Sequence, residues 1–178
     1  MKAIFAALIF TLSFGCAHFF GEHDGNHHEH ESSQVKEPAD WDGIEVASMG
    51  RHYFSKTPTS NSLTFAKQEG IEAVINLTEE TDKSIEEASK AKGIAYYHIV
   101  VPANEPFSKE RFAEIEKVHK EHHGKVWVFC RSGNRAAGWF ATHLSMVEGM
   151  PLDDSISLAE KLGLTSEATK DKVREYAR

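Results

Sequence analysis

From residue 41 onward, short β-branched runs alternate with amphipathic stretches, and this alternation limits the fold more than any other feature of the sequence. Three runs predict buried strands: IEAVINL (71–77), IAYYHIVV (94–101) and KVWVF (125–129). Apolar residues at helical spacing follow each run, and glycines end several of the helical stretches. We therefore expect residues 41–178 to form one α/β domain, with a central, mainly parallel sheet flanked by helices. Ligands of such sheets bind beyond the carboxyl ends of the strands.

The third run leads directly into a polar loop, CRSGNR, at that edge of the predicted sheet. If the strand ends at Phe129 and a helix begins near Arg135, the backbone N–H groups of residues 131–135 converge on an anion at the helix N-terminus. The helix dipole then favours the thiolate form of Cys130. We predict that Cys130 is a catalytic nucleophile and that Arg135 binds the anion through its planar guanidinium. The alternative is a buried, structural thiol.

The four residues between Cys130 and Arg135 are predicted to form the substrate-binding loop: Arg131, Ser132, Gly133 and Asn134. Arg131 would steer anions from the rim, and Gly133 supplies the backbone freedom that a tight turn needs. Ser132 and Asn134 are expected to brace the loop through side-chain hydrogen bonds to the backbone. Trp127 and Trp139 are expected in the core, and His143 at a solvated helix position.

Residues 1–17 read as an export signal, because Lys2 precedes an apolar run that is too short to span a bilayer and ends in small residues. Cleavage after this segment and lipidation of Cys16, as in a bacterial lipoprotein, are alternatives. Either one predicts an exported, periplasmic protein, and the lipid would be its only contact with a membrane. Cys130 would then be the only free thiol.

Residues 18–40 are rich in histidine and acidic side chains and have almost no aliphatic ones, which predicts a linker without a core. Four of its histidines are weak candidates for a divalent metal site: His23, His27, His28 and His30. Nothing in the sequence fixes their geometry, so a solvated spacer is the favoured interpretation.

The formal net charge of −7 argues against a nucleic-acid partner, because phosphate backbones require clustered Lys and Arg. A small anionic substrate fits the predicted loop better. No cofactor is expected.

Four stretches resemble the beta-lactamase-hydrolase-like, phosphatase-like domain family: residues 50–77 (GRHYFS to VINL), 93–102 (GIAYYHIVVP), 126–140 (VWVFCRSGNRAAGWF) and 148–164 (EGMPLD to KLGL). The resemblance runs from about Gly43 to Leu164. It implies a cysteine-phosphatase-like fold with a cysteine nucleophile in an anion cradle. The loop CRSGNR is also similar to the active-site loop of rhodaneses, which are sulfurtransferases of another α/β fold.

The chain departs from the tyrosine phosphatase pattern in three ways. Four residues rather than five separate Cys130 from Arg135, and Phe129 stands where phosphatases place a histidine. Phosphatases also use an Asp, on a loop before the nucleophile, to protonate the leaving oxygen. No Asp occurs between Asp82 and Asp153, and Glu105 is the only carboxylate that we find similarly placed. Glu105 is the general acid if the chain is a phosphatase, although an exposed turn residue is the simpler interpretation.

Three functions follow from these observations. The favoured one is a sulfurtransferase that passes sulfane sulfur from thiosulfate or a persulfide through Cys130, since this chemistry needs no general acid. The alternative is a tyrosine- or dual-specificity-like phosphatase with a phospho-Cys130 intermediate. The third is a non-catalytic periplasmic protein that binds anions or metal ions.

Overall fold

The computed structural model describes residues 34–104 and 108–177. Several predictions fall outside these ranges and stay predictions: the export signal, the lipidation of Cys16, the histidines at 23, 27, 28 and 30, and the role of Glu105. Within the described part of the chain, no helix combines the length and the hydrophobicity that are needed to cross a membrane.

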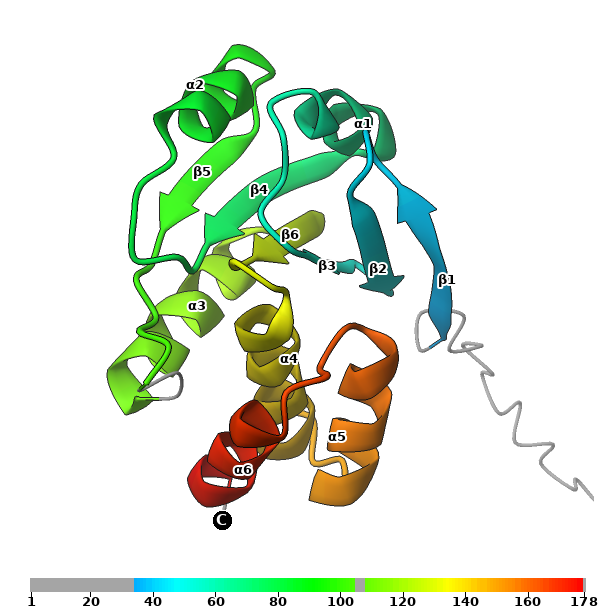
Figure 1. Ribbon diagram of the computed structural model, residues 1–178, viewed down its shortest axis with the longest axis vertical. Coiled ribbons are helices and arrows are strands. Elements are labelled where there is room, and N and C mark those ends of the chain that lie inside the picture. Colours follow the sequence, from blue (N-terminus) through cyan, green and yellow to red (C-terminus); the bar gives the residue numbers. More distant parts are fainter. Residues whose placement is uncertain (1–33, 105–107, 178) are drawn as a thin grey trace, which may run out of the picture.

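A six-stranded sheet runs through the domain in the order β1-β2-β3-β6-β4-β5 (Figure 1). Its strands are β1 (Val35–Asp40), β2 (Glu45–Met49), β3 (His52–Ser55), β4 (Ile71–Asn76), β5 (Ala95–His98) and β6 (Lys125–Phe129). The pairs β3–β6, β6–β4 and β4–β5 are parallel, whereas β1–β2 and β2–β3 are antiparallel. The predicted α/β fold with a mainly parallel sheet is confirmed.

Six helices surround the sheet: α1 (Ser62–Glu69), α2 (Lys83–Ala91), α3 (Lys109–Glu121), α4 (Asn134–Met146), α5 (Leu152–Lys161) and α6 (Glu167–Tyr176). Local signals begin and end them. Asp82 accepts hydrogen bonds from the first amides of α2, and Ser108 does the same for α3. Gly70 ends α1 in the left-handed conformation, with φ of 83°.

The core has two layers, one on each face of the sheet. Strand β6 contributes side chains to both layers, because successive side chains of a strand point to opposite faces. Val126 and Val128 belong to one layer, and Trp127 and Phe129 to the other. The first cluster packs against α3, α4, α5 and α6, and the second against α1 and α2 (Figure 1). Trp127 and Trp139 are fully buried, as predicted. Strand β6 is therefore the central element, covered on both faces.

The structure differs from the sequence interpretation at residues 35–40. We expected them to belong to the linker, but they form β1, which pairs with β2 at the edge of the sheet. Most side chains of β1 are exposed, so the strand leaves no hydrophobic pattern in the sequence. Backbone hydrogen bonds to β2 hold it in place.

The four parallel strands end together. Phe129 at the end of β6 is in register with Ser55 of β3 and with Asn76 of β4, and Asn76 is in register with His98 of β5. The loops that follow these strands therefore meet at one edge of the sheet, which is where ligands of parallel sheets bind.

Candidate active site

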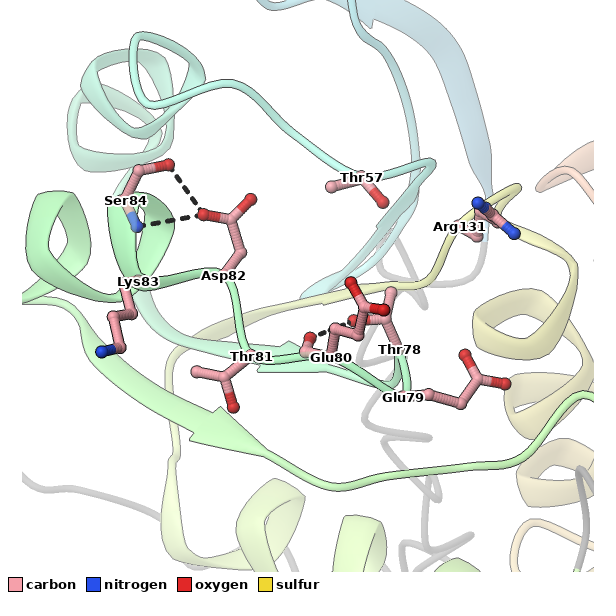
Figure 2. Close-up of a pocket in the computed structure, with 9 residues that line it drawn as sticks. All are labelled: Thr57, Thr78, Glu79, Glu80, Thr81, Asp82, Lys83, Ser84 and Arg131. Atoms are coloured by element: carbon pink, nitrogen blue, oxygen red, sulfur yellow. Dashed lines mark hydrogen bonds between the residues drawn. The ribbon is translucent and has the colours of Figure 1, made fainter.

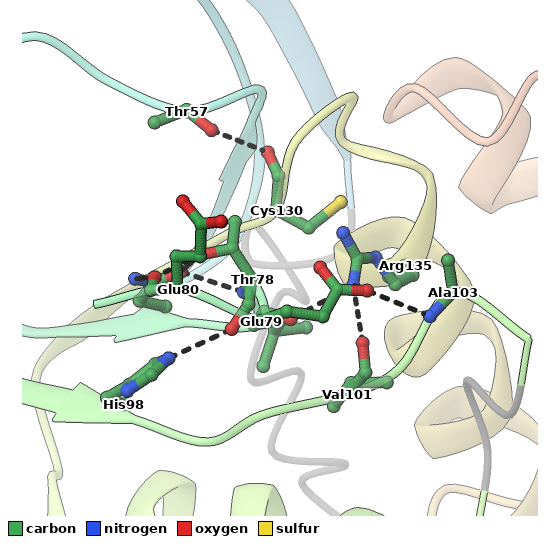
Figure 3. Close-up of polar contacts among 11 residues, drawn as sticks. Thr57, Thr78, Glu79, Glu80, His98, Val101, Ala103, Cys130 and Arg135 are labelled. Atoms are coloured by element: carbon green, nitrogen blue, oxygen red, sulfur yellow. Dashed lines mark hydrogen bonds and ion pairs between the residues drawn. The ribbon is translucent and has the colours of Figure 1, made fainter. Parts of the chain in front are cut away.

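Cys130 lies at this edge, directly after β6 and before α4. It has no exposed surface and contributes to the cluster that packs beneath α4. Its side chain is directed toward the guanidinium of Arg135 (Figure 3). The sequence prediction placed both residues at the carboxyl edge, and the structure brings them together there.

Gly133 shapes the turn between Cys130 and the helix. Its φ of 88° is left-handed, a conformation that residues with a Cβ rarely adopt, and it is the N-cap of α4. The glycine also lies against the end of β3, since a Cβ at this position would be 3.5 Å from the carbonyl carbon of Ser55. The turn therefore keeps the first amides of α4 close to Cys130, where no intrahelical carbonyl is available to them.

Arg135 is buried and held by backbone carbonyls. Its Nη1 donates to the carbonyl oxygens of Leu77, at 3.2 Å, and of Val101. We predicted that Arg135 would present its guanidinium to an anion. Within the described residues every hydrogen bond of its side chain comes from Nη1, so Nη2 and Nε are left for a ligand.

Glu79 completes the environment of Arg135. Its Oε1 lies 3.2 Å from Nη1 of Arg135 and accepts a hydrogen bond from the backbone N–H of Ala103 (Figure 3). A hydrogen bond from its own backbone amide, helped by Arg135, lowers the pKa of Glu79. The carboxylate is therefore ionised at neutral pH and neutralises part of the charge that an anionic substrate would meet.

Sequence reasoning missed Glu79. The available signal was its position three residues after the end of β4, a central parallel strand whose carboxyl end is at the predicted binding edge.

Asn76, at the end of β4, is buried and shapes this loop. Its Oδ1 accepts from the backbone N–H of Thr78 at 2.8 Å, and its Nδ2 donates to the hydroxyl of Tyr96 at 2.9 Å.

An open pocket lies between the loop after β4 and the exposed side chain of Arg131, the residue that follows Cys130 (Figure 2). Its lining residues are Thr57, Thr78, Glu79, Glu80, Thr81, Asp82, Lys83, Ser84 and Arg131. Carboxylates outnumber cations in this lining. The predicted rim position of Arg131 agrees with the structure, but the opposite wall is acidic.

Asn134 braces the loop from outside. Its Oδ1 accepts hydrogen bonds from the backbone N–H groups of Thr165 and Ser166, both at 2.7 Å, and so ties the start of α4 to the start of α6. Ser132 is exposed and accepts a hydrogen bond from Nδ2 of Asn134 at 3.3 Å. The side chain of Asn134 is thus engaged in bracing, whereas a substrate contact for Ser132 stays a prediction.

One expectation about histidine is wrong. His143 was predicted at a solvated helix position, but it is 4% exposed and lies in a buried polar cluster at the other edge of the sheet. Helical spacing alone does not reveal this, because the partners of His143 come from β3 and α3.

Comparison with solved structures places the fold among phosphatases. TpbA of P. aeruginosa superposes with a TM-score of 0.65 at 17% identity, over 83% of this chain and 91% of that chain. The core catalytic domain of the PP-IP phosphatase SIW14 from S. cerevisiae gives 0.62 at 13% identity, over 79% and 85%. Tk-PTP gives 0.59 at 20% identity, over 72% and 90%. No family model matches the sequence, and no curated protein matches it. The chain therefore has a cysteine-phosphatase-like fold.

Proposed function

We propose that this protein is a cysteine-dependent phosphatase that hydrolyses a phosphate monoester through a phospho-Cys130 intermediate. One observation carries the proposal: the thiol of Cys130 faces the guanidinium of Arg135 at the N-terminus of α4, at the carboxyl edge of the sheet. The likeness to phosphatases concerns the fold, and it favours this alternative over the sulfurtransferase that the sequence suggested first.

In the first step, the thiolate of Cys130 attacks phosphorus, so that an S–P bond forms and the bond to the ester oxygen breaks. The loop amides and Arg135 hold the phosphoryl oxygens, where negative charge is concentrated in the transition state. In the second step, water attacks phosphorus and the S–P bond breaks. Inorganic phosphate leaves, and the thiolate is restored.

The leaving oxygen limits the substrate class. Glu79 is the carboxylate nearest to Arg135 among the described residues, and its lowered pKa makes it a poor proton donor at neutral pH. The described residues therefore favour esters that release a weakly basic oxygen, such as aryl phosphates, over alkyl phosphates, whereas the predicted role of Glu105 as a proton donor lies outside them. A structure of TpbA in complex with phosphotyrosine shows an aryl phosphate bound to that protein, and we propose the same class of substrate here.

The acidic wall of the pocket narrows the class further. The lining has three carboxylates, from Glu79, Glu80 and Asp82, against the two cations of Lys83 and Arg131, and the chain has a net charge of −7. Polyanionic phosphates would be repelled, whereas a single phosphoryl group can be held by the loop and Arg135. The proposed substrate is therefore a small aryl phosphate monoester with few other negative charges.

Sulfur transfer is the second candidate, because four residues rather than five separate Cys130 from Arg135. The thiolate would attack a sulfane sulfur and form a persulfide, and a low-pKa leaving group such as sulfite would need no proton donor. The ionised Glu79 does not hinder this reaction.

Two assays separate the candidates: hydrolysis of p-nitrophenyl phosphate, and sulfur transfer from thiosulfate to cyanide. Each is run with the unmodified protein and with Cys130→Ser. We expect phosphate-ester turnover that is lost in the variant. Sulfur transfer without ester turnover would replace the proposal by the second candidate.

Export to the periplasm, with or without lipidation of Cys16, remains a proposal that rests on residues 1–17.

A further inference from the structure

A cluster of three histidines lies away from Cys130. His52 begins β3, His119 is in the last turn of α3, and His143 is near the end of α4. Each offers a ring nitrogen, and these nitrogens all lie within 4.8 Å of one another. His119 and His143 are almost completely buried. Convergence of imidazoles from three separate elements is typical of a transition-metal site.

The cluster and the nucleophile are at opposite edges of the sheet. His52 is in register with Val126 at the start of β6, whereas Cys130 follows the end of that strand. At a rise of about 3.3 Å per residue, the two positions are roughly 13 Å apart along the strand. An ion in the cluster would therefore stabilise the packing of β3, α3 and α4 and would not take part in the reaction.

A buried carboxylate orients one of the rings. Oε1 of Glu116 lies 2.9 Å from Nδ1 of His143, and Glu116 is 5% exposed. Its other oxygen, Oε2, is buried and has no hydrogen-bond partner within residues 34–104 and 108–177. A carboxylate that fixes the distal N–H of a ligating histidine is the usual second layer of a metal site.

The second nitrogen of His143 faces a carboxylate that can move. Nε2 lies 3.1 Å from Oε1 of Glu148, whose side chain is 49% exposed. When this contact opens, Nε2 must release its proton to solvent before it can bind a metal ion, and the carboxylate of Glu148 is then close enough to become a fourth ligand.

The other two rings meet inside the cluster. Nδ1 of His52 lies 3.2 Å from the carbonyl oxygen of Met49, which can only accept, so Nδ1 carries the proton and Nε2 of His52 keeps its lone pair. Nε2 of His52 lies 2.5 Å from Nε2 of His119, so at least one lone pair points into the cluster.

We propose that His52, His119 and His143 bind a zinc-type divalent transition-metal ion, with Glu148 as a fourth ligand. Tetrahedral zinc at about 2.0–2.1 Å from nitrogen holds its ligands about 3.3 Å apart, so the His52–His119 contact must widen by less than about 1 Å. Arg51 opposes the ion, because its Nη2 lies 2.9 Å from Nε2 of His119. This nitrogen can turn away while Nη1 keeps its hydrogen bonds to the carbonyl oxygens of His122 and Gly124. Neutral imidazoles favour zinc or copper over magnesium or calcium.

The test uses the full chain, with zinc as the probe and a chelator as the reference. Thermal unfolding should show that zinc raises the melting temperature, and His119→Gln should remove this shift. The matched control is the double variant His27→Gln/His28→Gln, which removes two linker imidazoles and should keep the shift. Glu116→Gln should weaken zinc binding by about 10–100-fold in calorimetry, as loss of an orienting carboxylate does elsewhere. A shift that is absent from the unmodified chain, or lost only in the linker variant, would overturn the proposal.

A second measurement does not depend on the folding of a variant. Amide hydrogen exchange of the unmodified chain should slow on addition of zinc in the peptides that contain His52, His119 and His143. Slowing confined to residues 18–33, or no slowing at all, would show that the buried histidines are only a hydrogen-bonded part of the core.

Discussion

Oε1 of Glu79 lies 3.2 Å from Nη1 of Arg135, on the guanidinium toward which Cys130 is directed. The carboxylate of Glu79 therefore competes with an incoming anion for the guanidinium of Arg135. Arg135 is positioned by the backbone carbonyls of Leu77 and Val101 and does not need Glu79 to stay in place. Glu79 therefore acts mainly on the charge of the site, and it should limit how tightly oxyanions bind.

Glu79→Gln should strengthen the binding of inorganic phosphate. The substitution keeps the shape of the side chain and removes a negative charge beside Arg135. Because Glu79 is half exposed, the gain should be small, about 0.5–1 kcal/mol or two- to fivefold in the inhibition constant. Glu80→Gln is the matched control, since Glu80 also lines the pocket but makes no ion pair with Arg135. Equal inhibition constants for the unmodified protein and Glu79→Gln would contradict this role.

The same pair predicts a pH dependence of anion binding. The pKa of Glu79 is lowered from 4.5, so its carboxylate loses its charge only below that value. As the pH falls through this lowered pKa, Arg135 is freed and sulfate should bind more tightly. Sulfate remains a dianion in this range, so the change reports on the protein. Calorimetry between about pH 6 and pH 3.5 measures it. In Glu79→Gln, the affinity for sulfate should no longer rise as the pH falls. An equal rise in the variant would mean that another group causes it.

Arg135→Lys should abolish activity and destabilise the fold. A lysine has three donors on one nitrogen and no planar fork, so it cannot hold both carbonyls and still offer two N–H groups to an anion; buried carbonyls that lose their donor cost about 1–3 kcal/mol. Arg131→Lys is the control, because Arg131 is exposed and the change should alter the free energy of unfolding by less than about 0.5 kcal/mol. Denaturant unfolding and ester turnover measure both effects. Full activity in Arg135→Lys would exclude a bidentate role for the guanidinium.

Gly133→Ala should inactivate the protein. A residue with a Cβ at a φ of 88° costs about 1–2 kcal/mol, and relief of this strain would move the amides that surround Cys130. Gly149→Ala is the matched control, since Gly149 has a φ of 74° with no atom within 4 Å of the added Cβ. Both variants should lose similar stability, whereas only Gly133→Ala should lose turnover. Equal activity of the two would show that the turn geometry is not needed.

The sequence predicts well those features that depend on local patterns. Alternation within KVWVF, the glycine in the loop and the helical spacing after it lead to Cys130 at the carboxyl edge of a parallel sheet. The sequence does not predict features that depend on contacts between segments far apart in the chain. Strand β1 is held by backbone pairing and has an exposed, featureless sequence. Glu79 and His143 acquire their roles from residues 56 and 27 positions away, and no periodicity reports such contacts.

The central claim, that Cys130 carries a phosphoryl group during turnover, can be tested directly. The unmodified protein is mixed with p-nitrophenyl phosphate, quenched by denaturant within one turnover and mapped by peptide mass spectrometry. The account predicts a phosphoryl adduct on the peptide that contains Cys130, and none in Cys130→Ser. An unmodified Cys130 peptide during rapid ester turnover, or a persulfide on Cys130 with thiosulfate and no phosphoryl adduct at all, would contradict it.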